Sequence, residues 1–325
     1  MAIFLAGVDV GGTRIKIGLS DQSGRLFSSR MLETHDYHDA ESFLQRIASE
    51  IKNQSVEAGV SIQAVGVGCP GRIDFNSGTI VWLKTKLEFL EGIPLSAALA
   101  DHLGCPVVCD NDVNAILAGE MRFGAGCGHQ DVIAITVGTG VGGALVIAGR
   151  MVRGHNWATG HFGYMSIDRS GPRHVSGNTG IFEEHCSHSG VLRQLREALK
   201  AGEISSLSRI EEPGLRELFD AAQAGDNLAR HLADRMTCVL GVLIANLIYA
   251  LDPELILVGG GLIAHRPDVL DTITREVTAR VAFLPPEASN IQPMTLGDTA
   301  GVLGGVALAM DAILTNEVGP HARIT

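Results

Sequence analysis

The chain has 325 residues, 46% hydrophobic and 19% charged, which is long and apolar enough for the cores of two ordinary domains. This composition excludes an intrinsically disordered protein, in which hydrophobic residues are few and net charge is high. The formal net charge of −11 argues against a general nucleic-acid-binding surface, because such surfaces neutralise phosphates with Lys and Arg.

The first nine residues lack the basic region of a signal peptide and become polar too early for one, so they predict a first strand in a cytoplasmic protein. The longest apolar stretch, residues 239–251, is interrupted by Gly241 and Asn246 and is too short to cross a bilayer. This favours a buried helix and no membrane span. Six scattered cysteines without a C-x-x-C pair are typical of reduced core thiols.

Residues 8–19 predict two strands around a glycine-rich turn, because apolar residues alternate on both sides of the glycines. A dinucleotide fingerprint or a P-loop needs a helix directly after its glycines, and neither motif is present here. The turn is about as typical of an ordinary β-hairpin as of a phosphate-binding loop. Its central residues are Gly11, Gly12 and Thr13.

The next segments alternate between helix and strand. Residues 38–58 have apolar side chains at helical spacing, residues 64–68 form an apolar strand that ends in a turn with Gly71, and residues 94–103 predict another helix. This order predicts a largely parallel α/β sheet with an antiparallel hairpin at one edge. Ligands of such sheets bind at the carboxyl ends of the strands, which makes the Gly71 turn a candidate site.

The strand at residues 107–109 is followed by three polar residues, Asp110, Asn111 and Asp112, and then by a helix. On its own this pattern is typical of a helix N-cap, in which Asp112 would only accept hydrogen bonds from free backbone N–H groups. We nevertheless place the chemistry here, because the rest of the chain has glycine-rich turns at the spacing that a phosphotransferase needs.

After a glycine-rich joint at residues 124–128 the opening pattern repeats, with strands at residues 131–137 and 144–148 around a second turn. A third glycine run follows the strand at residues 255–258, and a final apolar helix ends the pattern. Two similar half-chains predict a duplicated fold with a cleft between its halves. The residues of the second and third turns are Gly138, Thr139, Gly140, Gly259, Gly260 and Gly261.

Together these motifs resemble the ROK family of sugar kinases and related regulators, which belongs to the actin-like ATPase superfamily. The resemblance covers nearly the whole chain and implies two actin-like (ribonuclease H-like) α/β domains with an interdomain cleft. Residues 1–122 would form the domain with the sugar-binding and catalytic residues, and residues 123–298 the domain with the nucleotide-binding loops. A final helix near residues 299–315 would pack back onto the first domain.

The resemblance also implies roles for single residues. Asp112 would be the general base that takes the proton from a sugar hydroxyl, and its place at a helix N-terminus should keep it ionised. Asp9 would lie near Mg²⁺ with water between them, while the first two glycine-rich turns would surround the phosphates of ATP and the third its adenosine. The predicted sugar-binding residues are Gly71, Lys86, Asn111, His161 and Glu183.

Two stretches depart from the family pattern. His161 and Tyr164 stand where the family has a sugar-binding Glu and a zinc-binding His, and His174, Ser176 and Ile181 stand where it has three cysteines. Tetrahedral zinc needs four N or S ligands, and only His174 qualifies, so we predict no family-type structural zinc.

Three alternatives concern this altered region. Tyr164 and Ile181 could pack together at the position of the family's zinc. Glu183 could be a carboxylate at a helix start, stabilised by the helix dipole, rather than a sugar ligand. A substitute metal site is conceivable, although exposed histidines without metal are the favoured interpretation; its ligands would be His174, His185, Cys186 and His188.

Lys86 and His161 replace an Asn and a Glu of the family, which makes the predicted sugar pocket more positive. One hypothesis is therefore an anionic sugar, such as a sugar acid or a phosphosugar, because an anion favours a cationic partner. The competing interpretation is that Lys86 points to solvent and that His161 replaces one hydrogen-bonding group by another.

The sequence thus predicts an ATP- and Mg²⁺-dependent kinase of a sugar or sugar derivative, and by resemblance a homodimer. One alternative is a sugar-binding regulator or pseudokinase, which the altered stretch at residues 160–164 favours and the intact Asp9 and Asp112 oppose. Another is a nucleotide-driven activator, which would be expected to have a cysteine-held cluster. The first strand begins at Ile3, so we expect no DNA-binding module before it.

Overall fold

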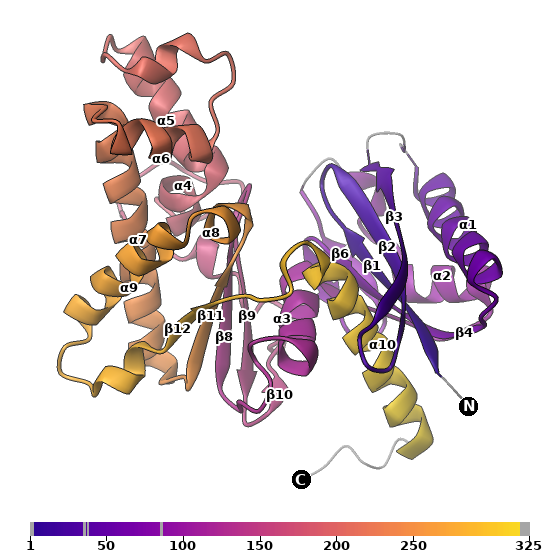
Figure 1. Ribbon diagram of the computed structural model, residues 1–325. Coiled ribbons are helices and arrows are strands. Elements are labelled where there is room, and N and C mark those ends of the chain that lie inside the picture. Colours follow the sequence, from indigo (N-terminus) through magenta and orange to yellow (C-terminus); the bar gives the residue numbers. More distant parts are fainter. Residues whose placement is uncertain (1–2, 35–36, 38, 85–86, 319–325) are drawn as a thin grey trace. The chain divides into compact units, whose positions relative to one another are not determined.

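The computed structural model describes residues 3–34, 37, 39–84 and 87–318, and Figure 1 shows the chain coloured along its sequence. The chain forms two compact units. Unit 1 contains the chain up to residue 128, residues 151–158 and the chain from residue 295, and unit 2 contains residues 129–150 and 159–294. Residues 123–128, 151–158 and 295–298 therefore group with unit 1, whereas the sequence-based division assigned them to the second domain. That these units are independent domains stays a prediction.

Unit 1 is built on a five-stranded sheet with the order β3-β2-β1-β4-β7. The first three strands form an antiparallel meander, and β4 and β7 then add in parallel to β1. The predicted antiparallel hairpin at the edge of a parallel sheet is thus extended by one more antiparallel strand. The strands are β1 (Phe4–Val10), β2 (Arg14–Asp21), β3 (Leu26–Glu33), β4 (Ile62–Cys69) and β7 (Val107–Asn111).

Two pairs of helices cover this sheet. Helices α1 (Ala40–Ala58) and α2 (Leu95–Leu103) pack on one face, while α3 (Asp112–Phe123) and α10 (Ala300–Val318) pack on the other (Figure 1). The alternation of side chains along β1 explains this division, because Val8 joins the core under α1 and α2 whereas Leu5 joins the core under α10.

Helix α10 approaches the sheet unusually closely, because glycines line the contact. A Cβ atom on Gly7 of β1 would lie 1.9 Å from the carbonyl oxygen of Val302, and one on Gly66 of β4 would lie 1.9 Å from that of Gly305. The close approach brings the start of α10 to the carboxyl end of β1. Two short strands complete unit 1 beside the sheet, β5 (Arg72–Asp74) and β6 (Thr79–Trp82).

Unit 2 repeats the same design with a sheet in the order β10-β9-β8-β11-β12. Strands β8 and β9 are antiparallel, and β11 and β12 add in parallel to β8. This repetition confirms the predicted mixed α/β fold with two similar halves. The strands are β8 (Val132–Val137), β9 (Val141–Ile147), β10 (Arg150–Met151), β11 (Leu255–Gly259) and β12 (Ile291–Pro293).

Four helices of unit 2 (α4, α5, α6 and α9) pack against one long helix, α7 (Asn227–Leu251). At 25 residues α7 is long and apolar enough to cross a membrane, so the argument that the apolar stretch is too short is wrong; the helix begins well before residue 239. However, 67% of its most apolar window is buried inside the protein, as expected of a core helix. The other helices are α4 (Phe182–Cys186), α5 (His188–Lys200), α6 (Leu215–Gln223), α8 (Gly261–His265) and α9 (Pro267–Arg280).

Candidate functional site

The sheet of unit 1 places several predicted site residues at the same edge. Asp9 of β1 pairs with Gly68 of β4, and Cys69 of β4 pairs with Asn111 of β7, so the carboxyl ends of three parallel strands lie side by side. The turn with Gly71 follows β4, and Asp112 follows β7. Residues from distant parts of the sequence therefore converge here because parallel strands bring their carboxyl ends together.

Asn111, rather than Asp112, caps helix α3. Its Oδ1 accepts hydrogen bonds from the N–H groups of Val113 (2.9 Å) and Asn114 (3.3 Å), and its Nδ2 donates to the carbonyl oxygen of Gly71 (3.0 Å). Asp112 Oδ1 accepts a hydrogen bond from the Val113 N–H at 3.0 Å. The simple interpretation of Asp112 as the helix cap is therefore wrong, because its neighbour performs that role.

The pKa of the Asp112 carboxyl is raised, chiefly because burial disfavours its charged form. Hydrogen bonds from Val113 and Asn111 oppose this shift, and the charge of Asp110 adds to it. The net direction is opposite to the one that the helix N-terminus alone predicts, because desolvation outweighs the favourable backbone groups. A raised pKa makes the carboxylate a stronger base than an exposed aspartate.

Gly71 needs to be glycine in this turn. Its φ is +95°, and a Cβ atom would lie 2.4 Å from the carbonyl oxygen of Trp82. The Gly71 carbonyl oxygen thus accepts a hydrogen bond from Asn111, which links the turn after β4 to the carboxyl end of β7.

Next to Asn111 in the chain, Asp110 forms a buried ion pair with Arg153. Asp110 accepts hydrogen bonds from Arg153 Nε (2.7 Å) and Asn114 Nδ2 (2.9 Å), and its side chain is only 2% exposed. The guanidinium of Arg153 lies 3.5 Å from the centre of the Phe75 ring. Sequence reasoning missed Arg153, because nothing in the pattern around residue 153 indicates a partner 43 residues earlier.

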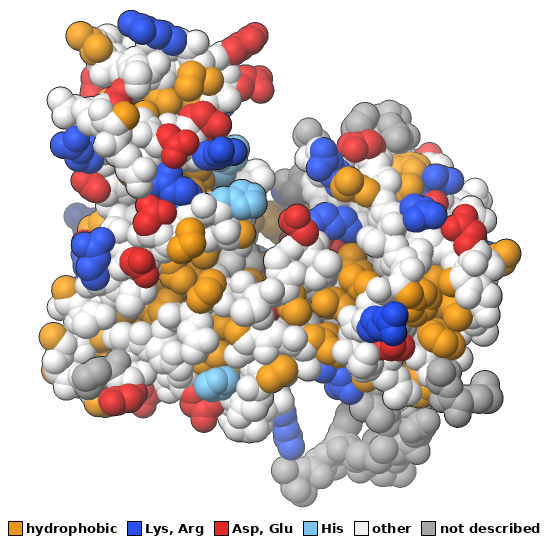
Figure 2. Space-filling model, in the orientation of Figure 1, with side chains coloured by type: hydrophobic (Ala, Val, Ile, Leu, Met, Phe, Trp, Pro, Cys, Tyr) orange, Lys and Arg blue, Asp and Glu red, His pale blue; other side chains and the backbone are white. Residues whose placement is uncertain are grey.

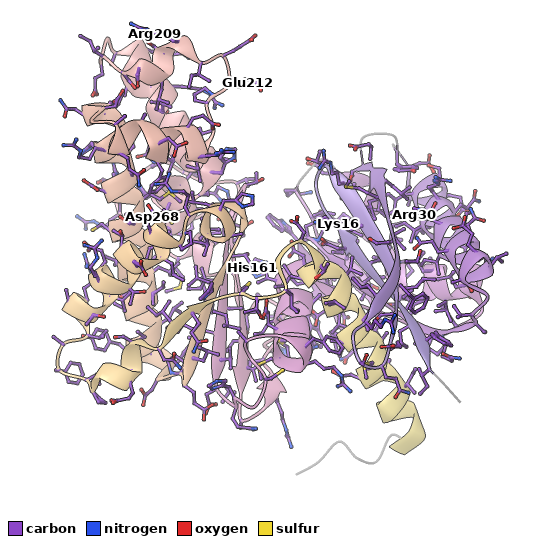
Figure 3. All side chains as sticks on the ribbon, viewed as in Figure 1. Lys16, Arg30, His161, Arg209, Glu212 and Asp268 are labelled. Carbon is purple, nitrogen blue, oxygen red and sulfur yellow. The ribbon has the colours of Figure 1, made fainter. Side chains whose placement is uncertain are left out.

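Asp9 lies among charged groups at the start of α10. Burial and the negative charge of Asp112 raise its pKa to about 6, and the positive charge of Lys16 opposes the shift. Lys16, labelled in Figure 3, is the cross-strand partner of Asp9 and donates a hydrogen bond to the carbonyl oxygen of Asp298. A Cβ atom on Gly301 would lie 2.2 Å from Asp9 Cγ. A hard cation such as Mg²⁺ would fit beside this carboxylate, since it prefers oxygen ligands and offsets the mutual repulsion of two acids.

The first glycine-rich turn is closed by backbone hydrogen bonds. The Gly11 N–H donates to the carbonyl oxygen of Arg14, and the Thr34 N–H donates to that of Thr13. Gly12 has open space around its Cα, so a ligand could approach the backbone closely.

The second glycine-rich turn is held by the first residues of α5. The N–H groups of His188 and Ser189 donate to the carbonyl oxygens of Gly138 and Thr139, and the Gly138 N–H closes the turn onto the carbonyl oxygen of Gly140. These hydrogen bonds fix the carbonyl oxygens of the turn on the side of α5.

Glu183, predicted as a sugar ligand, contacts this second turn. Its Oε2 accepts a hydrogen bond from the Val141 N–H at 2.8 Å, and a Cβ atom on Gly140 would lie 2.3 Å from the same oxygen. Burial raises the pKa of Glu183, while the Val141 hydrogen bond and the charge of His174 oppose the shift. Glu183 also belongs to the first turn of α4, as its alternative interpretation predicted.

The third glycine run joins β11 to α8. Gly260 has a φ of +110°, and a Cβ atom there would lie 2.0 Å from the carbonyl oxygen of Val137 in the neighbouring strand. Gly261 then begins α8, with open space at its Cα. The run therefore requires glycine at its centre and leaves the following helix N-terminus accessible.

In the region without zinc-binding cysteines, three aromatic rings lie next to one another at tilted angles. The Tyr164 ring lies 5.6 Å from that of His161 and 5.1 Å from that of His174. Ile181 is fully buried, and its backbone pairs with Ser166. The ring neighbours of Tyr164 are thus histidines, which the sequence did not predict.

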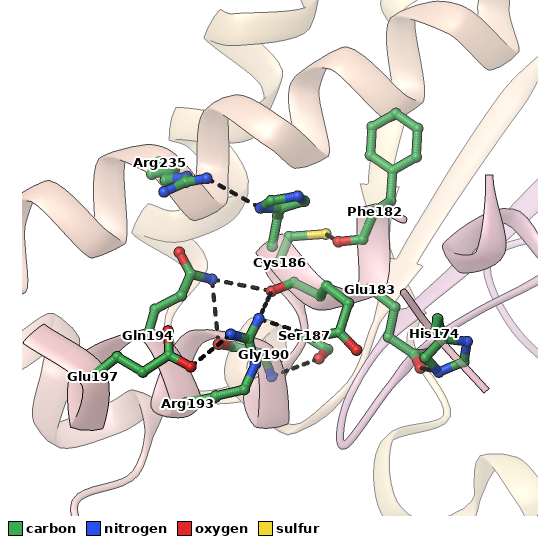
Figure 4. Close-up of polar contacts among 12 residues, drawn as sticks. His174, Phe182, Glu183, Cys186, Ser187, Gly190, Arg193, Gln194, Glu197 and Arg235 are labelled. Atoms are coloured by element: carbon green, nitrogen blue, oxygen red, sulfur yellow. Dashed lines mark hydrogen bonds and ion pairs between the residues drawn. The ribbon is translucent and has the colours of Figure 1, made fainter. Parts of the chain in front are cut away.

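The alternative metal ligands have other partners. His185 is buried, with its Nδ1 3.1 Å from Arg235, and Cys186 donates to the carbonyl oxygen of Phe182 (Figure 4). His174 and His188 are half-buried, so the interpretation of these histidines as exposed is wrong. The described ranges contain no group of three or more His, Cys, Asp or Glu side chains that could hold a metal ion. Lys86 lies outside the described residues.

Comparisons with known proteins agree with this geometry. A sequence model of the ROK family matches residues 5–312. A glucokinase from Thermotoga maritima is 32% identical over 95% of this chain and 98% of its own. The structure of a ROK hexokinase from Thermus thermophilus aligns with a TM-score of 0.82 at 28% identity, over 96% of this chain and 99% of its own. A ROK glucokinase from Streptomyces griseus, solved with glucose and AMPPNP, has a TM-score of 0.78 at 30% identity over 95% of this chain and 99% of its own.

Proposed function

This chain belongs to the ROK family and is an ATP-dependent carbohydrate kinase. We propose that it transfers the γ-phosphoryl group of ATP to a hydroxyl of a neutral hexose such as glucose. Asp112 would be the general base. The relatives with the names glucokinase and hexokinase support this choice of substrate.

The arrangement of Asn111 and Asp112 is the observation that carries the proposal. Because Asn111 caps α3 and bonds to Gly71, the Asp112 carboxylate keeps acceptor capacity for a substrate hydroxyl. Its raised pKa suits a group that takes a proton near neutral pH. Asp112 would remove the hydroxyl proton as the oxygen attacks the γ-phosphorus atom.

The glycine-rich turns would hold the nucleotide. Their backbone N–H groups and the hydroxyls of Thr13 and Thr139 would surround the phosphates, and the run at residues 259–261 would take the adenosine. Mg²⁺ would offset the charge of the phosphates, and Asp9 would hold it with water between them. In such a site catalysis comes mainly from alignment of the two reactants and from offset charge.

We also propose what the enzyme does not bind, where it is located and how it assembles. The net charge of −11, and the mixture of basic and acidic side chains on the face shown in Figure 2, support a protein that binds no nucleic acid. The buried α7 supports a protein that spans no membrane. By resemblance to the family we also propose a cytoplasmic homodimer.

The first test is an ADP-release assay with Mg·ATP and a panel of neutral hexoses, amino sugars, sugar acids and sugar phosphates. Turnover with neutral hexoses that Asp112→Asn lowers at least about 100-fold would support the proposal. Turnover with sugar acids or phosphosugars alone would instead favour the anionic substrate that Lys86 and His161 suggest. Sugars that raise the melting temperature without any turnover would indicate a regulator or pseudokinase and contradict the proposed activity.

A further inference from the structure

The segment between the two predicted sugar-binding residues of unit 2, His161 and Glu183, contains little regular structure. Isolated backbone bridges join Ser166 to Ile181 and Arg173 to Thr179, and Asn178 Nδ2 donates to the carbonyl oxygen of Tyr164 at 2.8 Å. Most of the segment is half-buried or exposed. Backbone hydrogen bonds also close it, among them those from the N–H groups of Ile167 and His174 to the carbonyl oxygens of Gly180 and Asn178, and side-chain contacts add to them.

His174 makes two such contacts at once. Its ring lies 5.1 Å from the Tyr164 ring, and Tyr164 in turn lies 5.6 Å from the ring of His161 (labelled in Figure 3). Its Nε2 lies 3.7 Å from Glu183 Oε1, a contact visible in Figure 4. The side chain of His174 is only 13% exposed.

A neighbouring serine fixes the direction of the His174 ring. The Ser176 N–H donates to His174 Nδ1 at 3.2 Å, which makes Nδ1 an acceptor. In the neutral imidazole the proton is then on Nε2, the atom that faces Glu183. His174 is thus oriented as a donor towards the carboxylate in either protonation state.

Glu183 carries this contact to the second glycine-rich turn. Its other oxygen accepts the Val141 N–H at 2.8 Å, directly beside Gly140. A carboxylate held from one side by a donor keeps its second oxygen aimed at the backbone, and it accepts more strongly when it is charged. A continuous row of contacts therefore runs from His161 through Tyr164, His174 and Glu183 to the turn.

We propose that His174 is a positioning residue of the kinase, which holds the second glycine-rich turn through Glu183 and orients His161 through Tyr164. The inference rests on the proposed function, since it assigns the nucleotide to the turn and the sugar to His161. In this chain the His174 ring, through its contacts with Glu183 and Tyr164, would thus order both binding groups without a metal ion.

Two variants of His174 test its contact with Glu183 and its contact with Tyr164 separately. His174→Phe keeps a ring beside Tyr164 but has no donor for Glu183, whereas His174→Gln keeps a donor but has no ring. We expect His174→Phe to weaken binding of Mg·AMPPNP about fivefold and to change glucose affinity less than about twofold. We expect His174→Gln to show the reverse.

The affinities would be measured by calorimetry on the full-length chain, each ligand alone. Hydrogen exchange at the Val141 amide adds a measurement that needs no ligand, and it should accelerate in His174→Phe only. Substitutions of His129 are the matched control, because His129 makes a similar contact with Glu254 (3.6 Å) in the same unit. They should leave all three measurements unchanged.

Equal losses for both ligands in both variants, as a merely loosened segment would give, would overturn the inference. So would unchanged affinities and unchanged Val141 exchange. A wild-type chain that bound neither ligand would contradict the proposed function instead, and the exchange rates would still decide whether His174 holds the turn.

Discussion

Removal of Arg153 should strongly destabilise the chain, because it leaves Asp110 without its cation. The two side chains are only 18% and 2% exposed, and the Nε–Oδ2 distance is 2.7 Å. Loss of one partner from a buried pair costs about 3 to 5 kcal/mol, since the remaining charge is uncompensated. Asp110 keeps the donors of Asn111 and Asn114, so we expect Arg153→Ala to lie at the lower end of that range, near ~3 kcal/mol.

Urea unfolding of the full-length chain measures this cost as a loss in the free energy of unfolding. Asp110→Asn should be milder, and the double variant should be more stable than the sum of the single losses predicts by about 1 to 2 kcal/mol. Arg30→Ala is the control, because Arg30 forms an exposed ion pair with Glu57 and should lose at most about 0.5 kcal/mol. A loss in Arg153→Ala no larger than in this control, or strictly additive losses, would refute the argument.

The same substitution should also change the pH dependence of the kinase. The charge of Asp110 raises the pKa of Asp112, and Arg153 offsets that charge. Without Arg153 the pKa of Asp112 should rise further, so the acidic limb of kcat/KM should move to higher pH. An unmoved limb would mean that Arg153 acts on stability alone.

Two further substitutions probe the carboxyl end of β1. The pKa of Asp9 is raised to about 6, so the folded chain binds a proton that the unfolded chain releases near pH 4; stability from Asp9 is therefore lost as pH rises through this window, by about 3 kcal/mol in all. Asp9→Asn should abolish turnover and flatten the fall in stability between pH 4 and 7 in urea titrations, and an unchanged slope would contradict this. Gly301→Ala should cost about 1 to 3 kcal/mol, because the new methyl group would meet Asp9 Cγ at 2.2 Å, whereas Gly261→Ala has open space and should not destabilise the fold. Equal stability of the two alanine variants would show that α10 can move away from β1.

Residues close together in sequence largely determined what kind of protein this is. The resemblance of the glycine-rich turns to those of known sugar kinases implied the family. The alternation around Gly11 and Gly12, the strand that leads to Asn111 and Asp112, and the repetition after residue 124 predicted the mixed α/β fold. They could do so because strand periodicity and turn glycines are local properties of the chain. The close contacts at Gly71 and Gly260 explain why these turns need glycine.

The tertiary structure alone decided which groups meet. The local pattern offered Asp112 as a helix cap, but Asn111 performs that role, and its bond to Gly71 depends on the pairing of β4 with β7. Arg153 and Gly301 act on Asp110 and Asp9 from distant parts of the sequence, and Lys16 acts on Asp9 through the pairing of β1 with β2. The direction of the Asp112 pKa shift could not be predicted either, because burial depends on everything that packs around the carboxyl and not on its neighbours in sequence.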